Sequence, residues 1–393
     1  MAKKYILGVD VGTGSVKALA GMVNESGDIA ILGSGTVATA GINKGKVVNV
    51  GELAAAVKEA AECAAAAAKI PADAIYLGIG GPDVSSENSL GSIDSYSTTA
   101  ITAGDLESAC GAALIKTVAE DQRILHVLPI RYWLDGENLG REPLGKCGTR
   151  LEVEAHVVTI PETVIGSLVN ILATKGHYIA GVTANLITGT QVLLETANDC
   201  LVMDFGAGVT DVVIYSGGKI VFSASLPLGG EYITGDIVQG IGVSRLHAEG
   251  IKRYYARLSK ALRGQKVMLD CNDYGTTDKH VSFDFLYTIV ESRVEEMVAI
   301  IMESIESSLS RYPVNKILLT GGGSLLPSVA ECLERSFGMP VQLTTPKNLP
   351  AEYAHPGNSA CFGVLSYAAR HSLVKEAPAR PWHSLVRKIK DLI

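Results

Sequence analysis

Two short segments of this 393-residue chain combine an aspartate with closely spaced glycines, a pattern suited to binding a phosphorylated ligand. They are Asp10-Val-Gly-Thr-Gly14 and Asp204-Phe-Gly-Ala-Gly208. Glycines let successive N–H groups turn toward one anion, and Thr13, Ser15 and Thr210 add hydroxyl donors. An adjacent aspartate can hold Mg²⁺ through water, because magnesium keeps several waters. A single copy of this pattern is also typical of an ordinary hairpin turn. Two matched copies favour binding of a triphosphate from both sides.

Repeated strands and helices surround these turns. Apolar, β-branched residues flank each turn, over residues 5–21 and 200–217, which predicts two antiparallel strands joined by a tight turn. Apolar runs at residues 74–81 and 316–323 each follow a helical stretch and end in glycines. The repetition predicts an α/β protein in which helices cover a sheet in each of two duplicated halves. Residues after the glycines have strand character, unlike a dinucleotide fingerprint, and no Walker A loop occurs.

The composition excludes several classes of protein. With 47% hydrophobic and 19% charged residues, the chain can bury a large core, and its net charge of −7 argues against a nucleic-acid partner. Seven cysteines without a C-x-x-C pair do not predict a disulfide framework or a zinc site, and they fit a reducing compartment. We expect no signal peptide, because the apolar run at the N-terminus is short and ends in Asp10. We expect no membrane span, because the alanine run at residues 54–68 contains charges.

At these residues the chain resembles the superfamily of actin, DnaK and the sugar kinases. Residues 10–17 resemble its first phosphate motif, residues 204–211 its second, and Gly321-Gly-Gly-Ser324 its adenosine motif. Within that superfamily the closest resemblance is to the bacterial cell-division family FtsA, and it covers nearly the whole chain. Residues 124–136 and 143–156 are similar to the subdomain that is inserted in this family. A mere surface elaboration is the alternative for that segment.

The resemblance implies an actin-like, ribonuclease H-like fold: duplicated α/β domains around a nucleotide cleft, an inserted subdomain and a C-terminal amphipathic helix. From the residues, we expect a helix over 105–119 and strands over 123–134 and 150–159 within the insert. The expected units are a first half at 1–81, 161–203 and 357–370, the insert at 82–160, a second half at 204–238 and 314–356, an upper subdomain at 239–313, a linker at 371–381 and the terminal helix at 382–393.

ATP and Mg²⁺ are the ligands that the resemblance implies, with Asp10 and Asp204 as catalytic acids that hold the metal through water. Hydrolysing relatives place Gln or Glu near residues 181–188, where this chain offers only Asn185, so we expect at most a weak ATPase. The implied nucleotide-binding residues are Gly12, Thr13, Gly14, Ser15, Lys17, Gly206, Ala207, Gly208, Thr210, Gly229, Gly230, Glu231, Glu249, Lys252, Arg253, Gly321, Gly322, Gly323 and Ser324. Glu249, Lys252 and Arg253 fall on one side of a helix, and a solvated salt-bridging face is the alternative.

The last twelve residues have the pattern of a helix that lies in a membrane interface. At 100° per residue, six apolar side chains share one face and cations border it. We expect binding to anionic lipid, or alternatively docking on the protein's own core or on a partner. The residues expected to contact the membrane are Trp382, Leu385, Val386, Arg387, Lys388, Ile389, Lys390, Leu392 and Ile393.

The family also implies partners. FtsA proteins bind the C-terminal tail of the tubulin-like FtsZ, and Arg293 stands at a matching basic position, although an exposed helix with internal ion pairs is an alternative. The resemblance therefore implies an ATP-binding, filament-forming adaptor that tethers FtsZ filaments to the cytoplasmic face of the cell membrane at the division site and helps to recruit other division proteins. A metabolic kinase and a PilM-like pilus-assembly protein are the alternatives. A DnaK-like chaperone would need a peptide-binding domain for which no chain remains.

Overall fold

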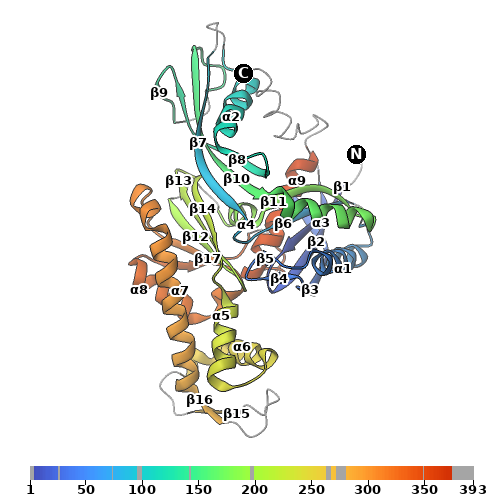
Figure 1. Cartoon of the computed structure of the whole chain (residues 1–393), viewed down its shortest axis with the longest axis vertical. Helices are drawn as coiled ribbons and strands as arrows, with labels where there is room; N and C mark the ends of the chain where they lie inside the picture. Colours follow the sequence, from blue (N-terminus) through green and yellow to red (C-terminus); the bar gives the residue numbers. More distant parts are fainter. Residues whose placement is uncertain are drawn as a thin grey trace.

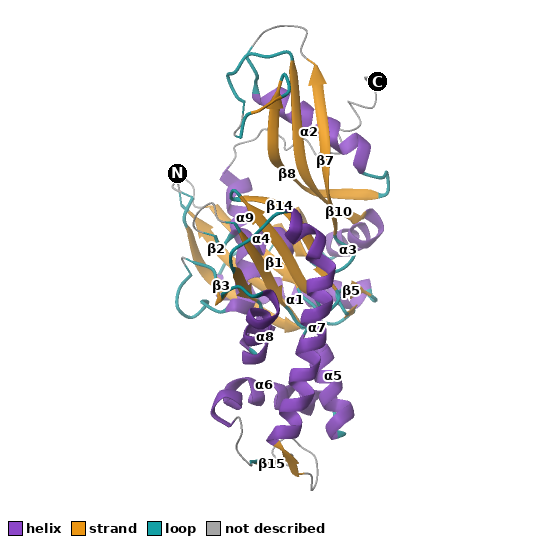
Figure 2. Ribbon diagram, turned by 90° about the vertical axis from the view of Figure 1, so that its left-hand side faces the viewer, coloured by secondary structure: helices purple, strands orange, loops and turns teal. Residues whose placement is uncertain are grey.

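The computed structural model describes residues 4–24, 27–72, 74–94, 100–140, 143–194, 199–262, 267–270, 280–347 and 349–373. The molecule is elongated (Figure 1). Two five-stranded sheets form its centre, a four-stranded sheet with one helix forms one end, and helices α5, α6 and α7 form the other. The view in Figure 2 keeps the same three-part arrangement.

The first half is built on a sheet of order β11-β6-β1-β2-β3. Its strands are β1 (Lys4–Val11), β2 (Ser15–Val23), β3 (Ile29–Ala38), β6 (Ala74–Ile79) and β11 (Tyr178–Ala184). Helix α1 (Val50–Ala68) packs on β2 and β3, and α9 (Ser359–Leu373) packs on β1, β2 and β6. Neighbouring residues of β1 belong to different cores, Leu7 with α1 and Ile6 with α9. Both faces of the sheet are therefore covered, which explains the continuous apolar run of β1.

The second half repeats this plan in a sheet of order β14-β13-β12-β17-β18. Its strands are β12 (Cys200–Phe205), β13 (Thr210–Ser216), β14 (Lys219–Leu226), β17 (Ile317–Thr320) and β18 (Val341–Leu343). In each half the aspartate strand pairs antiparallel with the strand after its turn and parallel with the glycine-ended strand. The predicted duplication and the predicted hairpins are confirmed.

Long helices form the upper part of the second half. They are α5 (Gly230–Ile241), α6 (Arg245–Leu262), α7 (Phe283–Arg311) and α8 (Pro327–Phe337), with a short hairpin of β15 (Met268–Asp270) and β16 (His280–Ser282). Helix α7 begins where the Ser282 hydroxyl accepts the N–H of Phe285, and its buried residues recur every three or four positions. The boundary expected between residues 238 and 239 falls inside α5.

The inserted unit is a sheet of order β7-β10-β8-β9 covered by one helix. It consists of β7 (Ser85–Asp94), α2 (Ala103–Thr117), β8 (Gln122–Leu134), β9 (Glu137–Asn138) and β10 (Arg150–Pro161), which continues into α3 (Glu162–Thr174). Thr102 and Asp105 form a capping box at the start of α2. The helix and both strands predicted within the insert are confirmed to within two residues.

Smaller elements complete the described chain. They are the hairpin β4 (Ile42–Asn43) and β5 (Lys46–Val47), helix α4 (Asn185–Gln191), and the 3₁₀ turns η2 (Gly322–Leu325) and η3 (Pro356–Asn358). Helix α9 runs on to Leu373, past the expected end at residue 370, and the predicted terminal helix at 382–393 lies outside the described residues. Among the helices that are described, none has the length and apolar character needed to cross a membrane.

Candidate functional site

The two aspartate-glycine turns meet at the junction of the halves. A Cβ placed on Gly14 would lie 2.9 Å from the Cβ of Ala207 in the opposite turn. A Cβ on Gly208 would lie 2.5 Å from Cγ2 of Thr13. Because any side chain at either glycine would push the turns apart, glycine is what allows the backbones to approach this closely. The structure therefore brings together the two predicted phosphate motifs from positions nearly two hundred residues apart.

Three carboxyl groups lie around these turns, with Asp10 and Asp211 buried and Asp204 half-buried. Asp10 and Asp204 are the last residues but one of β1 and β12, and Asp211 lies directly across the hairpin from Asp204. Burial raises the pKa of Asp10 to about 6 and that of Asp211 to about 6. Burial, with Asp211 and Asp10 as further causes, raises the pKa of Asp204 to about 8. Burial thus disfavours the charged form of each carboxyl group, and a cation bound nearby would favour it and lower these pKa values.

Asp10 has two neighbours that favour its charged form. The Asn185 amide, at the start of α4, donates from Nδ2 to Asp10 Oδ1 at 2.7 Å. Lys17 lies opposite Asp10 in the β1–β2 hairpin and lowers the pKa of that carboxyl. The Lys17 ammonium donates to the Gly357 carbonyl oxygen in η3, so it links the first hairpin to the start of α9. The amide of Asn185 is thus engaged with Asp10, which makes it a positioning group for that carboxylate.

The second turn is fixed to the first turn of α5. The N–H of Gly230 donates to the Gly206 carbonyl at 3.1 Å, and that of Glu231 donates to the Ala207 carbonyl at 2.7 Å. A Cβ on Gly229 would lie 2.5 Å from the Ala207 carbonyl oxygen, so this glycine also permits close contact. Thr210 is fully buried, and its hydroxyl donates to the Leu228 carbonyl at 2.8 Å. Its proton is therefore used within the fold, whereas the sequence predicted it as a phosphate donor.

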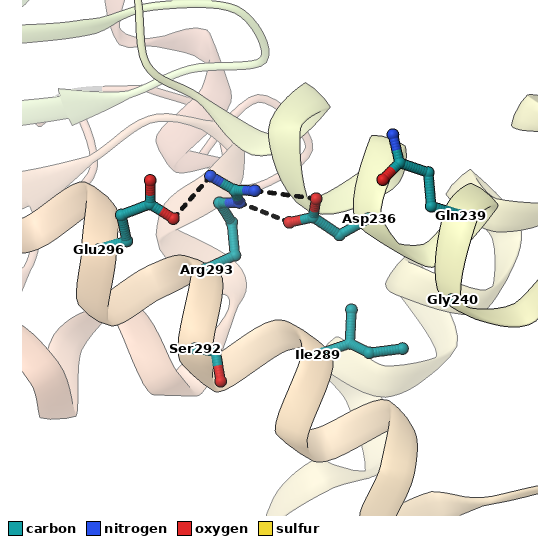
Figure 3. A pocket seen from close by; sticks show the side chains of 7 residues that line it. All are labelled: Asp236, Gln239, Gly240, Ile289, Ser292, Arg293 and Glu296. Atoms are coloured by element: carbon teal, nitrogen blue, oxygen red, sulfur yellow. Dashed lines mark hydrogen bonds and ion pairs between the residues drawn. The ribbon is translucent and has the colours of Figure 1, made fainter.

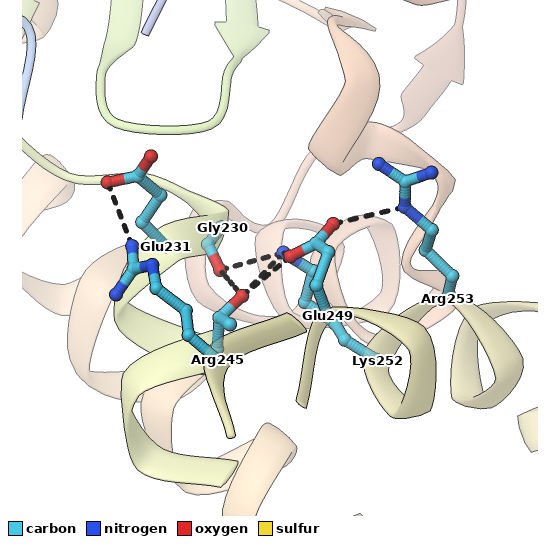
Figure 4. A network of polar contacts seen from close by, with 7 residues as sticks. Gly230, Glu231, Arg245, Glu249, Lys252 and Arg253 are labelled. Atoms are coloured by element: carbon cyan, nitrogen blue, oxygen red, sulfur yellow. Dashed lines mark hydrogen bonds and ion pairs between the residues drawn. The ribbon is translucent and has the colours of Figure 1, made fainter. Parts of the chain in front are cut away.

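Helix α6 joins the same region through Lys252 (Figure 4). The Lys252 ammonium donates to the Gly230 carbonyl at 3.0 Å and to the Thr234 hydroxyl at 2.9 Å, and it pairs with Glu249 at 2.7 Å. Glu249 also accepts from Arg253 at 3.1 Å. The ion pairs expected as the alternative for this helix face are present, and the network ends at the loop beside the second glycine turn. Arg245 pairs with Glu231 at 3.3 Å at its edge.

The predicted adenosine motif forms η2 directly after β17. Gly321 has a φ of +87°, a conformation that favours glycine, and a Cβ there would lie 2.3 Å from Asp204 Oδ1. Gly323 lies against the Phe205 ring, while a Cβ on Gly322 would meet nothing within 4 Å. The Ser324 hydroxyl is buried and donates to the Gly321 carbonyl at 2.6 Å. The motif thus packs against the Asp204 strand and leaves Gly322 open.

These residues fit a magnesium ion that is held through water and a ligand. Within the described part of the chain, no three side chains of the usual metal-binding kinds are grouped to hold an ion directly. One Asp211 oxygen, Oδ1, is buried without a hydrogen-bond partner. The carboxyl groups of Asp10, Asp204 and Asp211 against one lysine leave an excess of acid, which a divalent cation would offset.

Two features at the junction of the halves were not predicted from the sequence. Asp211 was expected only as the end of a motif, although its position seven residues after Asp204 matches that of Lys17 after Asp10. The tip of the β4–β5 hairpin was not predicted at all. A Cβ on Gly45 would lie 2.3 Å from Cγ1 of Val209, and the Lys44 ammonium lies 4.6 Å from the centre of the Tyr232 ring. Hairpin alignment could have identified Asp211, whereas the tip contacts depend on tertiary packing.

Arg293 lies in a separate pocket between α5 and α7 (Figure 3). Its guanidinium donates to both oxygens of Asp236, at 2.5 and 2.9 Å, and to Glu296 at 2.7 Å. The pocket has a volume of about 440 Å³ and is also lined by Gln239, Gly240, Ile289 and Ser292. Arg293, the predicted partner residue, thus already forms ion pairs with Asp236 and Glu296 of its own chain, and it lines the pocket.

Comparisons with known proteins agree with this geometry. A family model described as "Cell division protein FtsA" matches residues 201–363, and a second, the SHS2 domain inserted in FtsA, matches residues 81–159. The cell division protein FtsA of Pseudomonas aeruginosa is 31% identical over 374 residues, which cover 93% of this chain and 89% of that protein. This chain belongs to the FtsA family. The FtsA protein of Escherichia coli K12 is 26% identical over 95% of this chain and 93% of its own. The predicted family is confirmed.

Solved structures confirm the actin-like fold. The PilM–PilN type IV pilus biogenesis complex matches with a TM-score of 0.66 at 17% identity, over 94% of this chain and 98% of the other. MreB5 of Spiroplasma citri bound to ADP matches with a TM-score of 0.53 at 12% identity, over 94% and 97%. Identities this low establish the fold alone. The FtsA-type insert, at almost the predicted residues 82–160, adds the family's own feature to that fold.

Proposed function

We propose that this FtsA-family chain binds ATP with Mg²⁺ between its two halves and uses the nucleotide as an assembly switch. The observation that carries the proposal is the contact of two glycine turns surrounded by Asp10, Asp204, Asp211 and Lys17. Bound Mg²⁺ would neutralise phosphate charge together with the buried carboxylates. Asp10 and Asp204 would accept from its waters, and Lys17 would add the cation on the first-half side. A protein of related fold, MreB5 of Spiroplasma citri, has been solved bound to ADP.

Hydrolysis in this proposal is slow. Phosphoryl transfer to water needs a side chain that orients the attacking water. Asn185 is the candidate in the segment 181–188, and its Nδ2 is already donated to Asp10. With no acid or glutamine in that segment, nucleotide binding contributes mainly by favouring the state that binds it.

The proposed partner site is the pocket around Arg293. An acidic peptide such as the FtsZ C-terminal tail would offer carboxylates to the guanidinium in place of Asp236 and Glu296, because Arg pairs with carboxylates in a bidentate manner. The hollow beside Ile289 has room for an apolar side chain of the same peptide. Membership of the cell-division family supports FtsZ as the source of that peptide and other division proteins as further partners.

The proposed membrane site is the terminal segment from Trp382 to Ile393, which rests on its sequence pattern. One short helix binds lipid reversibly, but a filament that presents many tails gains avidity of about 10² or more. Polymerisation and attachment would therefore reinforce each other. This would place the protein at the cytoplasmic face of the cell membrane, where head-to-tail filaments of the chain tether FtsZ filaments at the division site.

A matched pair of glycine variants tests the nucleotide site. Gly208→Ala forces a Cβ against Thr13 and should weaken MgATP binding at least roughly tenfold, because the turns must separate. Gly235→Ala on α5 is the control, since a Cβ there meets nothing within 4 Å. Isothermal titration calorimetry on both proteins gives the affinities. Equal affinity for MgATP, or no binding by the unaltered protein, would reject the proposed site.

Two further experiments test the adaptor. Removal of residues 382–393 should abolish sedimentation with anionic liposomes and the formation of ATP-dependent filaments on lipid, and equal sedimentation would reject the anchor. Arg293→Glu should abolish binding of a synthetic FtsZ tail peptide, while Arg335→Glu, which breaks an exposed pair with Glu295, should not. Unchanged peptide binding by Arg293→Glu would reject that pocket.

A further inference from the structure

The inserted subdomain contacts both actin-like halves through buried polar groups. Figure 1 shows its strands β7, β8 and β10 reaching from the end of the molecule to the two central sheets. Strand β8 lies beside β11 of the first half, and β7 and β8 both lie beside β14 of the second. Apolar side chains follow the same division, since Leu125 belongs to the core that contains Leu7, and Ile130 to the core that contains Met203.

On the first-half side the contact is made by His126. Its Nε2 accepts the N–H of Ala184 at 3.0 Å and lies 2.8 Å from the Thr183 hydroxyl oxygen. Because Nε2 is an acceptor, the ring proton is on Nδ1 and the imidazole is neutral. The next residue, Asn185, donates to Asp10 at 2.7 Å. One peptide unit and one amide side chain therefore separate the insert from the first phosphate motif.

On the second-half side the contact is made by His156 and two residues of β7. Asn88 Nδ2 donates to the Val221 carbonyl at 2.9 Å, so its Oδ1 accepts from His156 Nδ1 at 2.6 Å. His156 Nε2 then accepts from the Ser223 hydroxyl at 2.8 Å, and Ser86 donates to the Ser223 carbonyl at 2.5 Å. His156 is 1% exposed, so these bonds are shielded from water.

Strand β14 carries this contact to the second phosphate motif. In the β13–β14 register, Ser223 pairs with Val213 and Ser225 pairs with Asp211. Ser223 is therefore two residues from Ser225, the residue that pairs with Asp211. A shift of the insert against β14 must move the strand that backs Asp211.

The second-half contact is looser than the first. A cavity of about 390 Å³ adjoins it, lined by residues of the insert, β14 and α7, among them Glu87 and Arg311. The Tyr312 hydroxyl at this cavity is buried without a hydrogen-bond partner. Polar contacts beside an unfilled space can rearrange at lower cost than a close-packed core. The contact between the insert and β14 can therefore accommodate a movement between the two halves.

We propose that the inserted subdomain is a brace between the two halves, in which His126 positions the Asn185–Asp10 pair and His156 holds β14 behind Asp211. The prediction that this brace affects nucleotide dissociation rests on the proposed function. Coupling between two binding sites is reciprocal. A ligand that binds the insert would therefore change the affinity for nucleotide by the same factor by which nucleotide changes the affinity of the insert for that ligand.

The test compares two serine-to-alanine variants in the full chain. Ser223→Ala removes the hydroxyl that His156 accepts, whereas Ser89→Ala removes a buried hydroxyl that bonds Ala113 within the insert. Dissociation of a fluorescent ATP analogue should become roughly threefold to fivefold faster in Ser223→Ala and stay unchanged in Ser89→Ala. His156→Leu, which also loses the Asn88 bond, should give a larger acceleration.

Hydrogen exchange supplies a second readout that does not need nucleotide. His126→Leu should speed exchange in β14, and Ser223→Ala should speed exchange at residues 183–185, although each change lies on the opposite side of the insert. His126→Gln, which can place an acceptor near Ala184, should restore the normal rate in β14. Purely local changes in exchange together with unchanged nucleotide dissociation would overturn the brace. If the unaltered protein binds no nucleotide, the proposed function fails while the exchange comparison still decides the brace.

Discussion

The two phosphate turns share their backbone plan and differ in charge. In the first hairpin the residue opposite Asp10 is Lys17, and in the second the residue opposite Asp204 is Asp211. The duplicated register thus places a cation in one half where the other has a second acid. Asp10 gains Lys17 and Asn185 as partners, and its pKa of about 6 stays below the value of about 8 for Asp204.

This asymmetry indicates a division of roles within a duplicated fold. The first turn is nearly balanced in charge by its own chain. The second turn, with Asp204 and Asp211 together, holds an excess of acid that favours a cation supplied with a ligand. The backbone of both turns can therefore be similar while the second turn carries the larger excess of acid.

The largest effect is expected from Lys17→Met, which removes the cation from the first turn. MgATP affinity should fall roughly a hundredfold, because a charge-assisted contact is lost and Asp10, Asp204 and Asp211 remain without a balancing lysine. Lys58→Met on α1, whose ammonium pairs with Glu62, is the control and should bind normally. Calorimetric titration of both variants measures the difference. Normal affinity in Lys17→Met would remove the basis of the comparison.

The insert's contact with the second half should give stability a pH dependence. Burial lowers the pKa of His156 from 6.5 to about 4, so the unfolded chain binds more protons between these values. The contribution of His156 to stability is then fully present above pH 6.5 and is lost as the pH falls toward 4, by about 2 kcal/mol between pH 7 and pH 5. The raised pKa values of Asp10 and Asp211 act with the opposite sign in this range, so the comparison of two proteins that differ only at residue 156 isolates the histidine. The groups around the ring are Asn88 and Ser223, with Glu87 and Arg311 at the adjoining cavity.

Urea unfolding at a series of pH values measures this loss. The control is His156→Gln, which cannot take up a proton in this range and should flatten the part of the curve that His156 contributes. The same slope in both proteins would assign the pH dependence to other groups, such as His126, whose pKa burial lowers to about 3.

A smaller effect is expected from Asp211→Asn, which makes the second turn carry one acid, as the first does. Without ligand the free energy of unfolding should rise by about 1 kcal/mol, because one buried carboxyl no longer opposes Asp204. The gain in ATP affinity on adding Mg²⁺ should shrink roughly tenfold. Urea unfolding and titrations with and without Mg²⁺ measure both quantities. A variant that keeps the full magnesium response would show that Asp211 has no part in the metal site.

The smallest effect is expected at the β4–β5 hairpin. Lys44→Met removes the cation beside Tyr232 and should speed release of bound nucleotide by about threefold or less, since exposed cation–π contacts contribute about 0.5–1 kcal/mol. Stopped-flow displacement measures the rate. Tyr232→Phe, which keeps the ring, should release nucleotide at the normal rate, and faster release there would assign the effect to the hydroxyl.

Much of the fold could be predicted from local pattern. The alternation of apolar runs with glycine turns predicts both hairpins, and the same reading predicts the helix and two strands of the insert. Asp10 and Asp204 were found in this way because their motif is contiguous. Thr210 was predicted as a phosphate donor, but its hydroxyl donates to the Leu228 carbonyl, and sequence does not tell where a buried hydroxyl points. Arg293 was predicted as a partner residue by likeness to the family, but its bond to Asp236, on a different helix, was not foreseen.

Local residue order was thus enough to specify two similar hairpins, because turn chemistry and strand patterning act over a few neighbours. The arrangement of charge between them depended on long-range packing. Burial in the folded chain raises the pKa of Asp204 and Asp211, and Asn185 reaches Asp10 only because β11 ends beside β6. The same holds for His126 and His156, which are ordinary strand residues in the sequence and become links between domains when three sheets meet.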